Sequence, residues 1–139
     1  MTSSTRRRLP ETRPSTTKTF RLRSPQEDGT VKVFRCHATL GFHPDGTPGE
    51  LFLKIDKQGS TISGLADGLA VAVSLGLQHG VQIDDYVRKF RHTRFEPSGA
   101  TGDPDYPMAS SLLDILAVFL EKAAEKALVE ASRKTKNVP

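Results

Sequence analysis

The stretch LKIDKQGSTISGLADGLAVAVSLGLQHG, residues 53–80, decides the fold, because the spacing of its apolar residues changes part-way along. Its start, LKID, alternates apolar and polar residues as a half-buried β-strand does. After Gly59 the apolar residues recur every three or four positions, which is the period of an α-helix with one buried side. Ser60 or Thr61 can cap the start of this helix, and Gly80 is a natural stop. The predicted apolar stripe consists of Ile62, Leu65, Leu69 and Val73.

Small residues recur at every fourth position of the same helix. Glycines inside a helix cost about 1 kcal/mol each relative to alanine, so a compensating contact is expected. A step of four residues turns the helix by about 400°, so the row drifts, and Gly64, Gly68 and Ala72 are the members that can face one neighbour. Small side chains let another backbone come close. We therefore expect the strand layer or another helix of this chain to pack against them. The full row is Ser60, Gly64, Gly68, Ala72, Gly76 and Gly80.

Three alternating stretches, at residues 18–23, 30–42 and 50–56, predict β-strands. The polar turns between them are short, and Asp45-Gly46 is a strong hairpin signal, which favours antiparallel pairing. Two further helices are expected.
The first covers residues 83–90, and the second begins near Pro107 or Met108.

These elements predict the α+β class: a small antiparallel sheet of about three strands packed against two or three helices. The folded domain is expected to span residues 18–133. A flexible basic arm, residues 1–17, would precede it, and a disordered tail, residues 134–139, would follow.

Positive charge gathers at the N-terminus. The chain has a net charge of +4, and residues 1–23 hold seven arginines or lysines against a single acid, Glu11. Two interpretations stay open: a solvated tail that keeps a neutral body soluble, or an arm that binds nucleic-acid phosphates. No aromatic residue interleaves the first basic run to stack on bases. The candidate nucleic-acid arm comprises Arg6, Arg7, Arg8 and Arg13.

A second candidate site is the start of the helix after Gly59. Hydroxyls and a lysine gather there beside free helix N–H groups, which together can bind an anion or nucleotide phosphate. The spacing is not that of a P-loop, and the hydroxyls are equally explained as helix caps. A more distant arginine in the basic segment RKFRHTRFEPSG could add charge. The candidate residues are Lys57, Gly59, Ser60, Thr61, Ser63 and Arg94.

Other chemistry is not indicated. The single cysteine, Cys36, excludes an internal disulfide and is expected to be a small core residue. The four histidines are scattered, so no metal site is predicted. No apolar run of eighteen residues and no secretory signal occur, so we expect a cytoplasmic protein without a membrane span.

Several long motifs resemble one protein family. They are GELF at residues 49–52, GSTISGL at 59–65, SLGLQHGV at 74–81 and TRFEPSG at 93–99. The chain from residue 6 to about Leu120 is similar to a region near the C-terminus of adenosylcobalamin-dependent, class II ribonucleotide reductases. The stretch after Asp114 departs from the family pattern, which is richer in aromatic residues there.

The resemblance implies a link to deoxyribonucleotide supply, but the reductase activity does not follow from it. The family's chemistry uses a thiyl-radical cysteine and a cysteine pair that supplies two electrons, and this sequence has one cysteine. None of the family's catalytic or adenosylcobalamin-binding residues has a matching position, so no cofactor is expected in this chain. The resemblance alone would assign it ribonucleoside-diphosphate reductase activity.

The leading hypothesis is a free-standing relative of the reductase accessory region. It would be non-catalytic by itself and would bind a reductase, a nucleotide or its own copy as a homo-oligomer. The alternative is a nucleic-acid or nucleotide-binding protein that uses the basic arm together with Lys57 and Arg94.

Overall fold

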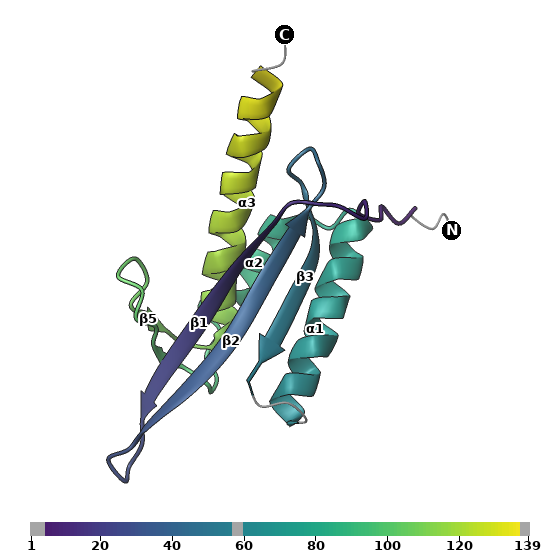
Figure 1. Ribbon diagram of the computed structural model, residues 1–139. Helices are drawn as coiled ribbons and strands as arrows, with labels where there is room; N and C mark the ends of the chain where they lie inside the picture. Colours follow the sequence, from purple (N-terminus) through teal and green to yellow (C-terminus); the bar gives the residue numbers. More distant parts are fainter. Residues whose placement is uncertain (1–4, 57–59, 137–139) are drawn as a thin grey trace.

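The computed structural model describes residues 5–56 and 60–136, and it has the predicted α+β class. One antiparallel sheet is covered by helices on one side, and the last helix extends beyond the sheet (Figure 1). The strands are β1 (Ser15–Pro25), β2 (Val31–Phe42), β3 (Pro48–Ile55), β4 (Gly99–Ala100) and β5 (Met108–Ala109). The helices are α1 (Thr61–Gln78), α2 (Ile83–Phe90) and α3 (Leu112–Lys136).

The sheet has the strand order β3-β2-β1-β4-β5. Its three long strands are those that the alternating sequence predicts. Phe20 pairs with Cys36, which in turn pairs with Ile55. The two additional strands have two residues each and come from the long loop after α2. Their brevity explains why periodicity could not reveal them.

Two expected boundaries are wrong. Strand β1 begins at Ser15, three residues before Lys18, because the threonine-rich start of the strand pairs with β2. Helix α3 begins at Leu112 and not near Pro107, because Met108 and Ala109 form β5 against β4. Ser111 then caps α3, and its Oγ accepts the Asp114 N–H over 3.0 Å.

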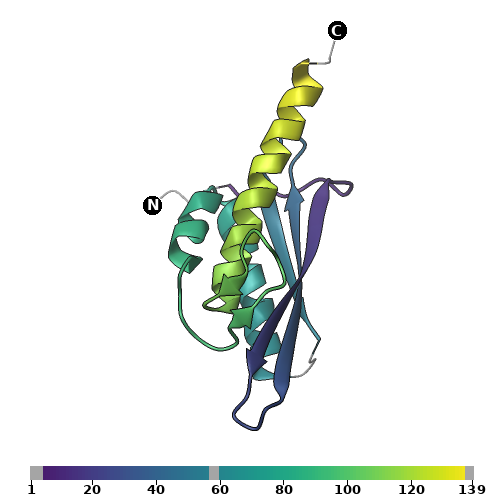
Figure 2. The same ribbon diagram turned by 90° about the vertical axis from the view of Figure 1, so that its left-hand side faces the viewer.

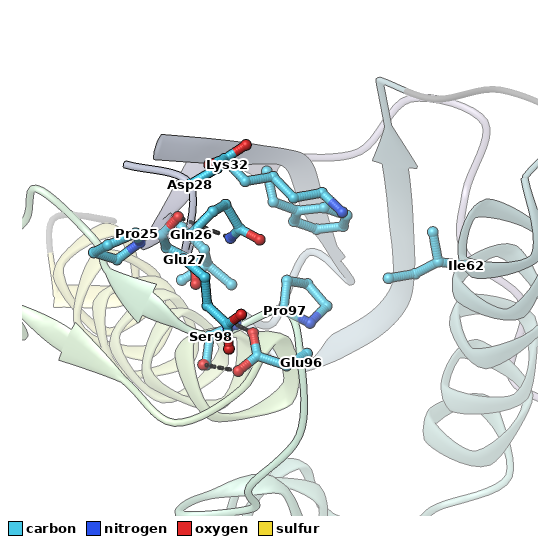
Figure 3. Close-up of a pocket in the computed structure, with 12 residues that line it drawn as sticks. Pro25, Gln26, Glu27, Asp28, Lys32, Ile62, Glu96, Pro97 and Ser98 are labelled. Atoms are coloured by element: carbon cyan, nitrogen blue, oxygen red, sulfur yellow. Dashed lines mark hydrogen bonds between the residues drawn. The ribbon is translucent and has the colours of Figure 1, made fainter. Parts of the chain in front are cut away.

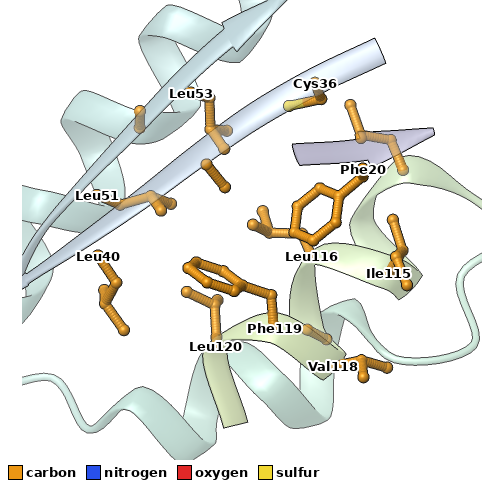
Figure 4. Close-up of a cluster of buried hydrophobic side chains, with 14 of the residues drawn as sticks. Phe20, Cys36, Leu40, Leu51, Leu53, Ile115, Leu116, Val118, Phe119 and Leu120 are labelled. Carbon is orange, nitrogen blue, oxygen red and sulfur yellow. The ribbon is translucent and has the colours of Figure 1, made fainter. Parts of the chain in front are cut away.

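The main core lies between α3 and the inner face of the sheet (Figure 4). Phe20 of β1 meets Phe119 of α3 edge to face, with ring centroids 5.6 Å apart. Such aromatic pairs stabilise a core beyond the area they bury. Helix α2 packs on α3, so both lie on one side of the sheet (Figure 2). Other buried residues of this core, on the strands and on α3, are Leu22, Cys36, Ala38, Leu40, Leu51, Leu53, Ile115, Leu116 and Leu120.

Helix α1 lies along β3, the edge strand of the sheet. Its Ser74 hydroxyl accepts the Leu51 N–H over 2.8 Å and donates to the Leu51 carbonyl over 3.1 Å. The Gln78 amide donates to the Gly49 carbonyl over 2.9 Å. These bonds satisfy edge groups that a strand otherwise leaves open to pairing with another chain.

The expected packing of the small-residue row is wrong. A Cβ added to Gly64 or Gly68 would meet nothing within 4 Å, and Ala72 is exposed. The residues of α1 that touch the core lie on the opposite side of the helix, about 180–240° around it from Gly64. They are Ala66, Ala70, Val73 and Leu77. The strand layer thus packs against alanines, and the outward position of the glycines has no explanation within the described part of the chain.

Candidate functional site

The predicted anion site at the start of α1 lies only partly within the described residues, because Lys57 and Gly59 fall outside them. Ser60 is the N-cap of α1, and its Oγ accepts the Ser63 N–H over 3.2 Å. Ser60 therefore caps the helix, which is the alternative to anion binding that the sequence left open. Thr61 is exposed.

Arg94 is distant in sequence from the start of α1. It is an exposed residue of the loop after α2. Ser63 instead lines a shallow hollow with Phe52, Lys54 and Asp67, and Arg94 does not line it. The candidate residues that can be described are therefore not gathered around one hollow.

The expected basic arm is tied to the folded body at Arg13. Its Nε and Nη2 donate to the two carboxylate oxygens of Glu50 in β3, with an Nη2–Oε1 distance of 2.9 Å. Its Nη1 donates to the carbonyls of Pro10 and Glu11 over 3.0 and 3.1 Å. The hydrogen bond to Glu50 raises the pKa of Arg13. Bidentate pairing of this kind fixes geometry as well as charge.

Arg6 and Arg7 also bond to the body. The Arg6 Nε donates to the Gln78 Oε1 over 2.5 Å. The two Nη atoms of Arg7 donate to Asp45 and Thr47, each over 3.0 Å. Hydrogen bonds from Thr47, and then from Arg7, lower the pKa of Asp45. Three of the four arginines proposed for nucleic acid thus already have partners in the fold.

A buried carboxylate, Asp114 of α3, organises the loop between α2 and α3. It accepts the His92 N–H over 2.8 Å, the Ser110 N–H over 3.0 Å and the Tyr106 hydroxyl over 2.8 Å. Burial by itself would raise the pKa of Asp114, but the hydrogen bonds from His92, Ser110 and Tyr106 outweigh it and lower the pKa. Sequence reasoning did not identify this cluster, because its members are brought together by an irregular loop.

Arg91 packs against Tyr106 and Asp114 of this cluster. Its guanidinium lies over the Tyr106 ring, 5.3 Å from the centroid, and its Nε is 3.8 Å from the Asp114 Oδ1. The buried Nε has no hydrogen-bond partner in the described part of the chain. Since the carboxylate is already saturated by shorter bonds, the cluster serves to hold the loop and its two short strands on α3.

Three outward-facing residues form a chain of bonds across β1, β2 and the end of β3. The Thr19 Oγ1 lies 2.8 Å from the His37 Nδ1, and the His37 Nε2 lies 3.1 Å from the Asp56 Oδ1. The order hydroxyl, imidazole, carboxylate is that of an activated nucleophile. Catalysis also needs donors aimed at a developing oxyanion. The N–H groups of the neighbouring strands are instead engaged in the hydrogen-bond ladder of the sheet. They cannot serve as such donors, so the two contacts of His37 only orient its ring on an open surface.

A hollow of about 790 Å³ lies between the turn after β1, the loop at Pro97 and Ile62 of α1 (Figure 3). Carboxylates of Glu27, Asp28 and Glu96 line it with one lysine, Lys32. No group of three or more side chains that could hold a metal ion occurs among the residues that the structure describes.

The single thiol is inert in this fold. Cys36 is fully buried on the inner face of β2, as expected of a core residue. Burial, aided by the charge of Asp56, raises its pKa to about 12. A thiol must lose its proton before it can attack a disulfide or bind a metal, so Cys36 is unsuited to both roles.

The outer face of α1 is an apolar surface that the fold leaves exposed. We define it as Gly64, Leu65, Gly68, Val71, Ala72 and Leu75, which span about 120° of the helix at 100° per residue. The exposed fractions of Leu65, Val71 and Leu75 are 70%, 60% and 40%. By length and composition α1 could cross a membrane, with a mean hydropathy of 1.3 and Asp67 as its one charged residue. The part buried in the fold is small, 28% of the helix.

Comparison with known families finds a match to the TSCPD domain over residues 6–124. Among curated proteins, the chain is similar to vitamin B12-dependent ribonucleotide reductases. It is 45% identical over 111 residues to those of Streptantibioticus cattleyicolor and Streptomyces coelicolor, and 40% identical over 115 residues to that of Rhodopirellula baltica.

These alignments cover 80%, 80% and 83% of this chain but only 17%, 10% and 10% of the three relatives. The chain therefore spans about a sixth or less of their length. No solved structure matches it.

Proposed function

The chain belongs to the TSCPD domain family and is related to vitamin B12-dependent ribonucleotide reductases, and from this premise we propose that it is a non-catalytic binding module that docks on such a reductase. It would contact the reductase through the outer face of α1. The chain would take the place that the matching region holds in the longer relatives and so contribute to deoxyribonucleotide supply.

The observation that carries this proposal is the exposure of Gly64 and Gly68 beside Leu65, Val71 and Leu75. A glycine in an exposed helix costs about 1 kcal/mol relative to alanine, and no contact in the fold offsets that cost at Gly64 or Gly68. A partner backbone pressed against these glycines would do so. Contiguous exposed apolar surface is also typical of interaction sites.

The chemistry of the chain's own residues supports binding over catalysis. Reduction through thiols needs a thiolate and a second thiol to form the disulfide. The 139 residues have one cysteine, and burial raises its pKa to about 12. A role in holding or positioning a larger protein requires neither.

The test uses the reductase of Streptomyces coelicolor from which the region matching this chain has been removed. Isothermal titration calorimetry with the purified chain should give saturable binding. Replacing Leu65 and Val71 by glutamate should weaken it at least tenfold, because charges would enter an apolar contact. The matched control is Leu128→Glu, which changes an exposed leucine of α3.

The control should leave the affinity unchanged. The proposal fails if the unmodified chain does not bind this reductase. It also fails if Leu128→Glu weakens binding as much as the changes in α1, because binding would then not depend on the outer face.

A further inference from the structure

The side of the sheet opposite α2 and α3 is open to solvent (Figure 2). Strand residues alternate between the two sides, so the sequence neighbours of the buried Phe20, Leu22 and Cys36 point outward. We call this surface the open face of the sheet. Its outward residues include Thr17, Thr19, Arg21, Arg23, Val33, Arg35, His37, Thr39, Phe52 and Lys54.

The open face carries uncompensated positive charge. Arg21 lies directly opposite Arg35 in the register of β1 and β2, an arrangement of like charges that destabilises a sheet. Arg23 and Lys54 extend the charge to both sides of this pair. All four side chains are exposed, and none has an ion pair or hydrogen bond to another residue of the described chain.

Asp67 of α1 lines one hollow with Lys54, so the arginines are the cations of this face that lack an acid beside them. The two acids that the strands carry on this face are already engaged. Glu50 holds Arg13 in a bidentate pair, and Asp56 accepts a hydrogen bond from His37. Neither is free to neutralise the arginines. Opposed cations without acids are the arrangement expected where a polyanion supplies the missing negative charge.

An aromatic ring accompanies the charge. Phe52 in β3 is 55% exposed and lies opposite Thr39, one residue pair away from Lys54 and His37. A phenylalanine on an exposed strand contributes nothing to the core, but it offers a flat surface on which any base can stack. The threonines around it supply hydroxyls that can bond to phosphate or sugar oxygens.

We propose that the open face of the sheet binds single-stranded nucleic acid. The phosphates lie along Arg21, Arg35, Arg23 and Lys54, and a base stacks on Phe52. This surface differs from the outer face of α1, so the proposal does not depend on docking to a reductase. It also differs from the basic arm, whose Arg6, Arg7 and Arg13 are bonded within the fold.

The test measures fluorescence anisotropy of a labelled 20-nucleotide dT strand with the full chain at several salt concentrations. Four phosphate contacts on a single strand predict a slope of about −3 in a plot of log affinity against log salt concentration. Arg21→Ala with Arg35→Ala should reduce that slope by about 1.4, and should not lower the melting temperature because a like-charge pair is removed.

Phe52→Ala should weaken binding about tenfold and leave the salt slope unchanged, because it removes stacking and no charge. The matched control is Arg88→Ala with Lys89→Ala. It removes the same charge from α2, on the covered side of the sheet. This control should leave affinity and slope close to those of the unmodified chain.

The proposal is overturned if the strand does not bind at 50 mM salt. It is also overturned if the α2 control weakens binding as much as the arginine pair, since net charge alone would then be responsible. Loss of binding with Arg8→Ala alone would assign the activity to the arm. If a polyglutamate peptide binds as tightly as the dT strand, and Phe52→Ala does not weaken its binding, the open face binds an acidic protein segment instead.

Discussion

Replacing Gly64 and Gly68 by alanine should stabilise this protein while weakening its attachment to a reductase. A Cβ at either position meets no heavy atom within 4 Å, and neither glycine has a positive φ. Nothing in the fold therefore opposes the higher helix propensity of alanine. At compatible sites such a change adds roughly 0.4–1 kcal/mol, so the pair should raise the free energy of unfolding by about 1.5 kcal/mol.

For a chain of this length, that gain corresponds to a rise in Tm of roughly 5 °C. Thermal unfolding followed by circular dichroism measures it. The matched control is Gly76→Ala in the same helix, where a Cβ would overlap the Tyr86 hydroxyl and the Tm should fall. A double variant that melts at or below the unmodified protein would refute the reasoning, because the glycines would then be contacted or strained within the fold.

The same double variant should bind the shortened Streptomyces coelicolor reductase at least tenfold more weakly in calorimetry. Two added methyl groups would hold apart backbones that the glycines allow to approach. Unchanged affinity together with increased stability would leave the glycines without a binding role and would remove the main support for the proposed function.

Three further predictions concern the loop cluster and the thiol. Asp114→Asn should lower the free energy of unfolding, measured by urea unfolding, by about 2–4 kcal/mol, because the new amide group would face a backbone N–H in either orientation. The control is Asp105→Asn, in the same loop but exposed. It should change the free energy of unfolding by less than about 0.5 kcal/mol. Because the pKa of Asp114 is lowered in the folded state, its stabilisation is present above about pH 4 and is lost as the pH falls through the folded pKa. The stability difference between the unmodified protein and Asp114→Asn should therefore narrow with acidification below pH 4, and a constant difference would contradict the assignment. Cys36 should resist a thiol-specific chromogenic reagent at pH 8 until urea unfolds the chain, and rapid reaction in the native protein would show that it is accessible.

The three long strands were predictable because alternating residues face opposite sides of a sheet, as Phe20 and Leu22 show. The buried state of Cys36 follows from the same alternation. The side of α1 that packs inward was not predictable from small residues, since alanine and glycine occur on both sides of the helix. What decides the orientation is the bonding of Ser74 and Gln78 to the edge of β3, which the local pattern does not reveal.

The charge pair of the open face is predictable from the sequence. Arg21 and Arg23 count toward the basic N-terminal region in the sequence, but they belong to a strand of a hairpin. Pairing that strand symmetrically about the turn at residues 26–30 places Arg21 opposite Arg35. The Asp114 cluster gives no comparable signal, because the positions of His92 and Ser110 depend on the irregular path of the loop.

Hydrogen–deuterium exchange of this chain, measured alone and with the shortened Streptomyces coelicolor reductase, tests docking through the outer face of α1 most directly. The account predicts that amide protection increases in peptides covering residues 64–75 and stays unchanged in the exposed part of α3 around Leu128. If the reductase binds while residues 64–75 exchange at their original rate, the outer face of α1 is not the docking surface.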